Sequence, residues 1–297
     1  MQKIQTRDSM LLAQRGSIKK GGIKTRELIL FVAMGLFALL MISPVLWMFS
    51  ASFQNQAEMF KASFNWIPLN ATLNSYRNVW VNGNLSGAFL TSLEVTLIYV
   101  PIHVLVCTLT GYVFAKFNFR FKNITFLFII ATMLIPQETT FFPVYDIVKN
   151  LGWLNTPQGV VLPFFFSGFG IFLMRQYALA IPNELIEAAK IDGCSDSRSF
   201  FSIALPLLQP GMTALAILAL TFIWNEFAWS RLVLSDPGSQ TLPIALYFLS
   251  HTAGVSQAIK YPDLLAASVL TAAPVLILFL FFQRRFIESI SSVGIKG

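Results

Sequence analysis

The sequence predicts an all-α protein that crosses a membrane several times, and three observations lead to this prediction. Hydrophobic residues make up 55% of the chain, whereas charged residues make up only 12%. Soluble domains carry about 25% charged residues, so this chain has too few charges to cover a surface that faces water. The apolar residues also gather in long runs, and most basic residues lie beside alternate ends of those runs.

Six apolar runs are long enough to cross a bilayer, which takes about 20 predominantly apolar helical residues. The first follows a basic stretch, but it is longer than the apolar part of a signal peptide, which has about 7–15 residues. We therefore expect this run to remain as a membrane helix. The expected spans are residues 28–50, 92–115, 123–144, 158–179, 211–233 and 264–283.

The distribution of basic residues predicts that both termini lie in the cytosol. Cytosolic segments next to membrane helices are rich in Lys and Arg. With a cytosolic N-terminus, 16 of the 21 Lys and Arg residues fall on the cytosolic side, which leaves five outside. Seven of them lie in the tail 1–27, so we interpret the net charge of +7 as an orientation signal or a lipid contact. We expect no nucleic-acid partner.

This topology divides the chain into segments. The basic tail 1–27 precedes the first span, 28–50, and an extracytoplasmic loop covers 51–87. A second outer segment, 234–263, is polar and interrupted by Pro and Gly. Cys107 and Cys194 fall in a span and in a cytosolic loop, so we do not expect them to form a disulfide.

The polar segment between the fourth and fifth spans carries the most specific motif of the chain. It reads E-A-A-x3-G-x9-I-x-L-P, from Glu187 to Pro206. Seven fixed positions would match by chance in fewer than about one in ten thousand chains of this length. Pro182 and Asn183 can start a helix, and Gly193 can end one. We expect a short polar helix here, followed by an element that ends at Pro206.

This motif resembles the cytoplasmic loop through which the permease subunit of an ABC importer engages a separate ATPase. Other segments resemble the carbohydrate group of these permeases, and in particular the shorter subunit of maltose-type systems. They are Pro136-Gln137-Glu138-Thr139, Trp224-Asn225-Glu226-Phe227, Gln240-Thr241-Leu242-Pro243, and the ending from Gln283-Arg284-Arg285-Phe286 to Gly294-Ile295-Lys296-Gly297. The resemblance implies a type I ABC importer permease fold, with a core over 88–283, a coupling loop over 181–206 and a cytosolic tail over 284–297.

The resemblance also implies function and partners. Glu187, Ala188, Ala189, Asp192 and Gly193 would couple to the ATPase, and the two alanines are small enough to let a partner surface approach. The partners would be two ABC ATPase subunits, a second permease chain (a different one, as is usual in this group), an extracytoplasmic solute-binding protein and membrane lipid. ATP and Mg²⁺ would be bound by the ATPase, in a bacterial or archaeal plasma membrane. The outer segment 234–263 would reach towards the binding protein. A re-entrant or interfacial helix without a partner is the alternative.

Four polar residues inside the expected spans are candidates for lining a pathway. A charge at the membrane centre costs about 2.5–3.5 kcal/mol, so each needs a reason. Gln137 and Glu138 lie about 14 residues into the third span, and Asn225 and Glu226 lie equally far into the fifth. At 1.5 Å per residue, both pairs lie roughly 20 Å from the cytosolic edge. Two interpretations stay open: a shared polar layer along the pathway, or hydrogen bonds between helices.

Other side chains in the spans are better explained by structure. His103 is expected to be a satisfied interior group rather than a proton carrier. Trp224 and Trp229 could stack on a sugar ring, although tryptophans at the membrane interface are more common.

The chain is not expected to be an enzyme. It has no G-x-x-x-x-G-K-[ST] loop for ATP, no H-E-x-x-H motif and only two histidines, so we expect no catalytic residue and no metal site. Two alternative functions remain. One is a secondary transporter driven by an ion gradient, which would need internal repeats and helices broken at residues such as Pro101, Pro136 or Pro163. The other is an ABC importer for a different polar solute, such as glycerol phosphate.

Overall fold

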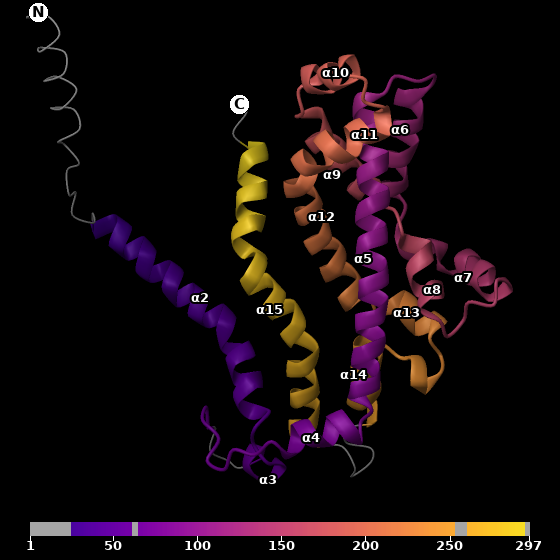
Figure 1. Ribbon diagram of the computed structural model, residues 1–297. Helices are drawn as coiled ribbons and strands as arrows, with labels where there is room; N and C mark the ends of the chain where they lie inside the picture. Colours follow the sequence, from indigo (N-terminus) through magenta and orange to yellow (C-terminus); the bar gives the residue numbers. More distant parts are fainter. Residues whose placement is uncertain (1–24, 61–64, 253–259, 295–297) are drawn as a thin grey trace, which may run out of the picture. The chain divides into compact units, whose positions relative to one another are not determined.

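The structure, a computed structural model, describes the backbone of residues 25–60, 65–252 and 260–294. This described part contains helices and loops and no strand, as expected for an all-α protein (Figure 1). The chain divides into two units, Met1–Met48 and Phe49–Gly297. Most of the first helix, α2 (Thr25–Ala51), belongs to the first unit and agrees with the first expected span. Its side chains are apolar and largely exposed, which suits a helix surrounded by lipid or by a partner.

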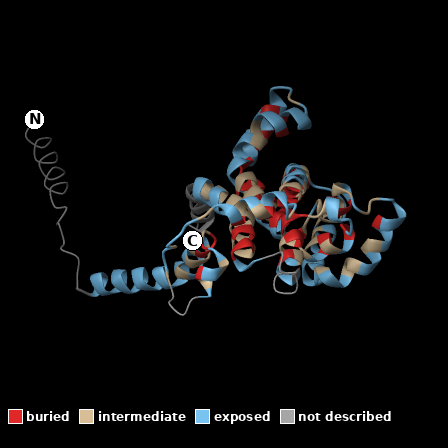
Figure 2. Ribbon diagram, turned by 90° about the horizontal axis from the view of Figure 1, so that it is seen from below, coloured by how far each residue is buried: buried red, intermediate tan, exposed pale blue. Residues whose placement is uncertain are grey.

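The second unit is organised around α5 (Leu85–Lys116), which covers the second expected span. This helix contributes to three hydrophobic clusters along its length, through Leu85, Val95 and Cys107 among others. Figure 2 shows the same distribution, with buried residues inside this unit and exposed residues around them. The helix α5 is therefore the central element of the second unit.

A close helix crossing explains why α5 lies against α9 (Gly168–Leu179). A Cβ atom on Gly111 would lie 2.7 Å from the backbone nitrogen of Arg175, so only glycine allows this approach. Small residues at helix contacts let backbones approach closely in membranes, where packing rather than the hydrophobic effect drives association. The glycine therefore fixes the position of the chain that leads into the E-A-A motif.

The third expected span, 123–144, is not one straight helix. The helix α6 (Lys122–Ala131) continues into a 3₁₀ turn, η1 (Thr132–Leu134), and then stops. The chain resumes with η2 (Gln137–Thr140) and α7 (Phe141–Asn150), turned by 98°. Pro136 explains the break, because it has no backbone N–H and it holds Ile135 in an extended conformation.

The fourth expected span, 158–179, is also broken. The helix α8 (Pro157–Val161) and the turn η3 (Leu162–Phe164) are followed by α9, with a bend of 54°. The extended residue Ser167 causes the restart, since its hydroxyl oxygen accepts a hydrogen bond from the Gly170 amide at 3.0 Å. The described residues thus contain four continuous helices that could cross a membrane, and six spans only if each bent pair counts as one.

The fifth span begins and ends earlier than the sequence predicted. The short helix α11 (Asp196–Ser199), the π-helical turn η4 (Phe200–Ala204) and α12 (Leu205–Asn225) follow one another without a gap. Pro206 lies in the first turn of α12, where proline is tolerated, so it does not end the preceding element as expected. The helix stops at Asn225 instead of continuing to residue 233, because Glu226 is extended and a new helix, α13 (Ala228–Val233), begins.

At the end of the unit opposite the motif lie α3 (Gln56–Met59) and α4 (Asn74–Val81) (Figure 1). The expected polar outer segment 234–263 contains the turn η5 (Pro237–Ser239) and an apolar helix, α14 (Leu242–Thr252). This helix packs on α5 and α15 (Tyr261–Gly294), and the Leu242 amide donates to the Ser92 hydroxyl at 2.8 Å. Much of the segment is therefore a packed helix rather than a polar loop. Residues 253–259 lie outside the described residues.

Candidate functional site

The motif forms a short helix, α10 (Asn183–Ile191), at one end of the second unit (Figure 1). The structure confirms its two boundaries. Pro182, with extended backbone, precedes the first turn, and Gly193 follows the last turn with a φ of +82°. The expected capping by Asn183 is wrong, because its side-chain oxygen accepts a hydrogen bond from Lys116 instead. Gly193 favours the left-handed conformation that ends the helix, since other residues pay about 1–2 kcal/mol to adopt it.

One face of α10 is exposed and the other is buried. Glu184, Glu187, Ala188 and Ile191 recur with the spacing of a single helical stripe, and all four are exposed. Ile191 is 86% exposed, which is unusual for a large apolar side chain on a polar helix. Its position in the stripe could have been read from the sequence, since it follows Glu184 by seven residues.

The two alanines of the motif have different environments. Ala188 lies on the exposed stripe, whereas Ala189 is only 5% exposed and faces the interior of this chain together with Ile186. The expectation that both alanines admit a partner surface therefore applies to Ala188 alone. Asp192 and Gly193 are exposed at the end of the helix.

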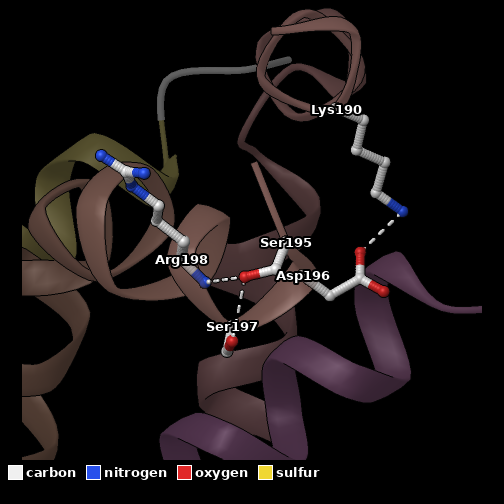
Figure 3. A network of polar contacts seen from close by, with 5 residues as sticks. All are labelled: Lys190, Ser195, Asp196, Ser197 and Arg198. Atoms are coloured by element: carbon white, nitrogen blue, oxygen red, sulfur yellow. Dashed lines mark hydrogen bonds and ion pairs between the residues drawn. The ribbon is translucent and has the colours of Figure 1, made fainter. Parts of the chain in front are cut away.

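The C-terminal end of α10 is joined to α11 by an ion pair (Figure 3). The Nζ atom of Lys190 lies 2.8 Å from Oδ1 of Asp196, and this carboxylate raises the pKa of Lys190 above its usual value. Ser195 starts α11, because its hydroxyl oxygen accepts a hydrogen bond from the Arg198 amide at 3.3 Å. Both charged side chains are half exposed, so solvent weakens the pair, which serves mainly to orient α10.

The N-terminal end of α10 is joined to the end of α5. The ammonium group of Lys116 donates hydrogen bonds to the carbonyl oxygen of Ile181 and, at 2.8 Å, to Oδ1 of Asn183. Nearby, Nε of Arg175 on α9 donates to the carbonyl oxygen of Phe114 at 3.3 Å. A cation near a helix N-terminus interacts unfavourably with the helix dipole, so Lys116 does not stabilise α10 through its charge. Its contribution is the pair of hydrogen bonds that join α5 to the start of α10.

A cavity of about 730 Å³ lies between the two broken helices. Its walls come from α5, α12, the break at Pro136 and the break before α9, and they hold polar groups among aromatic and aliphatic side chains. Unpaired backbone at membrane depth is tolerated where it lines such a cavity. The lining residues are Tyr99, His103, Thr132, Met133, Ile135, Pro136, Gln137, Thr140, Pro163, Phe164, Phe166, Ser167, Gly168, Phe169, Leu215, Leu218, Ala219 and Phe222.

Only one of the four polar candidates lines this cavity. Gln137 does so, and its amide makes no hydrogen bond with the described part of the chain. Glu138 is exposed outside the cavity, and Asn225 donates a hydrogen bond to the carbonyl oxygen of Thr221 at 2.8 Å. Neither of these two residues, nor Glu226, is among the residues that line the cavity.

Glu226 has a local structural partner. Its carboxylate accepts hydrogen bonds from the backbone amides of Trp229 and Ser230, both at 2.7 Å, and from the Ser230 hydroxyl. These bonds satisfy the first amides of α13, so the carboxylate is the reason that α12 stops and α13 starts here.

His103 has the interior contacts expected of a satisfied histidine. Its Nδ1 donates to the carbonyl oxygen of Phe164 at 3.2 Å, and its ring stacks on Tyr99 with centroids 5.0 Å apart.

The two tryptophans neither stack on a sugar ring nor lie at a membrane interface, so both interpretations from the sequence are wrong. Trp224 and Trp229 are buried, and their indole N–H groups donate to backbone carbonyls, so they pack the protein interior. Cys107 and Cys194 are unpaired, as expected.

Sequence reasoning missed most of the cavity. Thr132, Thr140 and Ser167 are hydroxyl residues within apolar runs, and each lies within five residues of a helix break. Pro136 was the available signal, because a proline inside an apolar run can break the helix and expose the polar groups around it.

Comparison with known sequences identifies a family and several relatives. Residues 107–291, more than half of the chain, match the family described as binding-protein-dependent transport system inner membrane component. The arabinooligosaccharides transport system permease protein AraQ of Halalkalibacterium halodurans is 34% identical over 272 residues, with 91% of this chain and 96% of the relative covered. The sn-glycerol-3-phosphate transport system permease protein UgpE of Pectobacterium atrosepticum is 30% identical, with 81% and 87% covered.

The fold is similar to that of a solved bacterial ABC transporter involved in the import of the acidic polysaccharide alginate. The TM-score is 0.81, the sequence identity is 21%, and the match covers 91% of this chain and 99% of that chain. A second structure, with a TM-score of 0.54 and 16% identity, contains a bacterial alginate ABC transporter in complex with a periplasmic protein that holds an alginate pentasaccharide. It covers 88% of this chain and 95% of that chain. These likenesses show the helical fold.

Proposed function

This chain belongs to the family of binding-protein-dependent transport system inner membrane components, and we propose that it is one permease subunit of an ATP-driven importer for a neutral carbohydrate. The exposed stripe of α10 is the observation that carries this proposal. A polar helix that presents Glu184, Glu187, Ala188 and the 86% exposed Ile191 has the composition of a docking surface rather than of a lipid contact. The partner is a separate ABC ATPase, which binds ATP and Mg²⁺.

We infer that α10 transmits the movement of the ATPase to the cavity. Lys116 joins the start of α10 to α5, and the Lys190–Asp196 pair joins its end to α11 and thus to α12. Both α5 and α12 contribute side chains to the cavity wall. A displacement of α10 therefore acts on two walls of the cavity through direct contacts. Glu187, Asp192 and Gly193 complete the exposed end of this docking surface.

The cavity is proposed as this subunit's part of the translocation pathway, with Gln137 as its free polar group. The described residues that line it include no Lys, Arg, Asp or Glu. Hydroxyl, amide and aromatic groups suit a polyhydroxylated solute, whereas a phosphate ester calls for Arg or Lys. This lining favours a carbohydrate, as in the name of AraQ, over glycerol phosphate, as in the name of UgpE.

In the proposed topology this chain has six spans, with each bent pair counted as one, and both of its termini lie in the bacterial cytosol. The distribution of basic residues supports this orientation, and it puts α10 on the side of the ATPase. The remaining partners are a second permease chain and an extracytoplasmic solute-binding protein.

Purification of this chain from its native membrane in a mild detergent tests the assembly. We expect mass spectrometry to find an ABC ATPase and a second permease at a near-equal ratio. Proteoliposomes of that complex, supplied with its binding protein, should take up a labelled arabinooligosaccharide only with ATP. A chain that purifies alone and transports under an ion gradient would contradict the proposal, and uptake of glycerol phosphate alone would overturn the carbohydrate assignment.

Two variants distinguish a loss of ATPase binding at α10 from a loss of solute binding in the cavity. Glu187→Arg reverses a charge on the exposed stripe, so uptake and ATPase binding should be lost while the subunit still inserts. Gln137→Ala removes the free amide from the cavity wall, so the ATPase should still bind while uptake falls. Uptake at the wild-type rate by Glu187→Arg would refute the role of α10.

A further inference from the structure

A second cavity, of about 520 Å³, lies at the turn between α5 and α6, and it shares no lining residue with the larger cavity. This turn lies at the same end of the second unit as α10 (Figure 1). It connects two expected membrane spans, so it lies where a spanning helix meets the headgroup region of the bilayer. The lining residues are Asn118, Phe119, Phe121, Lys122, Asn123, Ile124 and Arg175.

Two cationic side chains of this cavity have no acidic partner. Lys122 and Arg175 both line it, and both are half-buried. No described carboxylate forms an ion pair with either one, since the one ion pair among the described residues is Lys190–Asp196. Two like charges in one partly desolvated cavity are unfavourable unless an anion lies between them.

The guanidinium of Arg175 is held in a fixed position. It lies over the Phe126 ring, 4.3 Å from its centroid, and its Nε donates to the carbonyl oxygen of Phe114. No hydrogen bond uses its terminal amino groups within the described part of the chain, which leaves them free to bind a second group. A planar guanidinium with free amino groups is well suited to phosphate oxygens.

The start of α6 adds polar groups to the same cavity. Phe121 precedes the helix with a φ of +64°, and no side chain caps the first turn. The first amides of this helix therefore have no side-chain partner, and the helix dipole favours an anion near them. Asn118 and Asn123, which also line the cavity, can supply amide donors.

An apolar surface continues from the cavity along α6. Ile124, Leu127 and Phe128 are 53%, 67% and 70% exposed, respectively. They lie on a helix that is expected to cross the membrane, so this surface is suited to hydrocarbon chains. A free phosphate ion would use the charges but not this apolar surface, whereas a phospholipid uses both.

We propose that this cavity is a binding site for an anionic glycerophospholipid. Its phosphate lies between Lys122 and Arg175, and its acyl chains lie along Ile124, Leu127 and Phe128. The bound lipid neutralises the two charges and holds the α5–α6 turn against α9. Basic pockets beside membrane helices recognise lipid headgroups in this way.

The test uses the whole importer complex in nanodiscs that contain phosphatidylglycerol with a photoreactive diazirine near its glycerol. After illumination, peptide mass spectrometry measures labelling of residues 117–128. Lys122→Gln should lower this labelling about fivefold, because each basic residue near the surface contributes about that factor to anionic-lipid binding. Lys122→Arg should restore it. Lys149→Gln, a change of an exposed lysine on α7, is the matched control and should have no effect.

Four outcomes would overturn the proposal. Equal labelling in Lys122→Gln and Lys149→Gln would show that the charge does not bind the lipid. Equal labelling by a photoreactive phosphatidylcholine would show that the headgroup charge is not recognised. If excess inorganic phosphate removes the labelling fully, the site binds a free anion. If residues 117–128 are labelled only after the ATPase is removed, the turn is a protein contact in the complex. Arg175→Gln, assayed after a check of thermal unfolding, should repeat the loss seen with Lys122→Gln.

Discussion

Ile191 offers the most direct test of the docking surface, because it is exposed in this chain and is expected to be buried in the complex. We consider the change Ile191→Ala. The side chain is 86% exposed, so its truncation removes almost no contact within the permease subunit. Alanine also has a higher helix propensity than isoleucine, so α10 should remain folded. Any loss of ATPase binding then reports on the interface alone.

The size of the loss follows from the atoms removed. The change deletes three methylene equivalents, and each buried methylene contributes about 0.8 kcal/mol, so a fully buried Ile191 would lose about 2.4 kcal/mol of binding free energy. A free energy of 1.4 kcal/mol corresponds to a factor of ten, so the dissociation constant should rise about 50-fold. A side chain that is only half buried in the complex would give about sevenfold.

The assay is binding of the purified ATPase to immobilised nanodiscs that contain the permease subunits, measured by interferometry. Ile67→Ala is the matched control, since Ile67 is 78% exposed and lies in the chain between α3 and α4, the two helices at the opposite end of the unit. Thermal unfolding of both variants should match the wild type. A dissociation constant within twofold of the wild-type value would refute a docking role for this face of α10.

Three further variants test the elements around the site. Gly193→Ala meets no atom within 4 Å but must adopt a φ of +82°, so it should destabilise the end of α10 by about 1–2 kcal/mol, measured as a lower Tm. Lys116→Met should let the ATPase hydrolyse ATP while uptake per ATP falls, and unchanged uptake per ATP would show that the link to Asn183 carries no movement. Glu226→Gln should cost about 1–2 kcal/mol by weakening the bonds to the first amides of α13, seen in thermal unfolding. A loss of uptake without a change in Tm would instead assign Glu226 to the pathway.

The sequence predicted the long helices well and the interrupted ones poorly. Apolar length alone located α2, α5 and α15, because a continuous helix satisfies its own backbone in lipid. Length cannot reveal where a helix stops within an apolar run. At Pro136 the missing N–H was visible, but at Ser167 and Glu226 the break depends on a side chain that caps the next helix. Serine and glutamate occur in unbroken helices as well, so these caps emerge only in three dimensions.

In the candidate site, too, the local features could be predicted from the sequence, whereas the contacts between distant residues could not. The boundaries of α10 follow from Pro182 and Gly193, which act on the local backbone. The contrast between Ala188 and Ala189 follows from which face packs on the rest of the chain, and the motif itself does not specify that face. The links from Lys116 to Asn183 and from Arg175 to Phe114 join residues more than 60 positions apart, and such pairs cannot be read from one sequence.

The π-helical turn Phe200–Ala204 joins α11 to α12 and contains one residue more than an α turn. Deletion of one residue here would leave an ordinary α turn, so the elements before it would keep nearly the same direction around the axis of α12. The same deletion within the α-helical part of α12 would rotate those elements by about 100° and shift them by about 1.5 Å relative to the end of the helix. The exposed stripe of α10 would then point elsewhere relative to the cavity. The chain can therefore lose the extra residue of this turn without redirecting α10, whereas the length of α12 sets the direction in which α10 is presented.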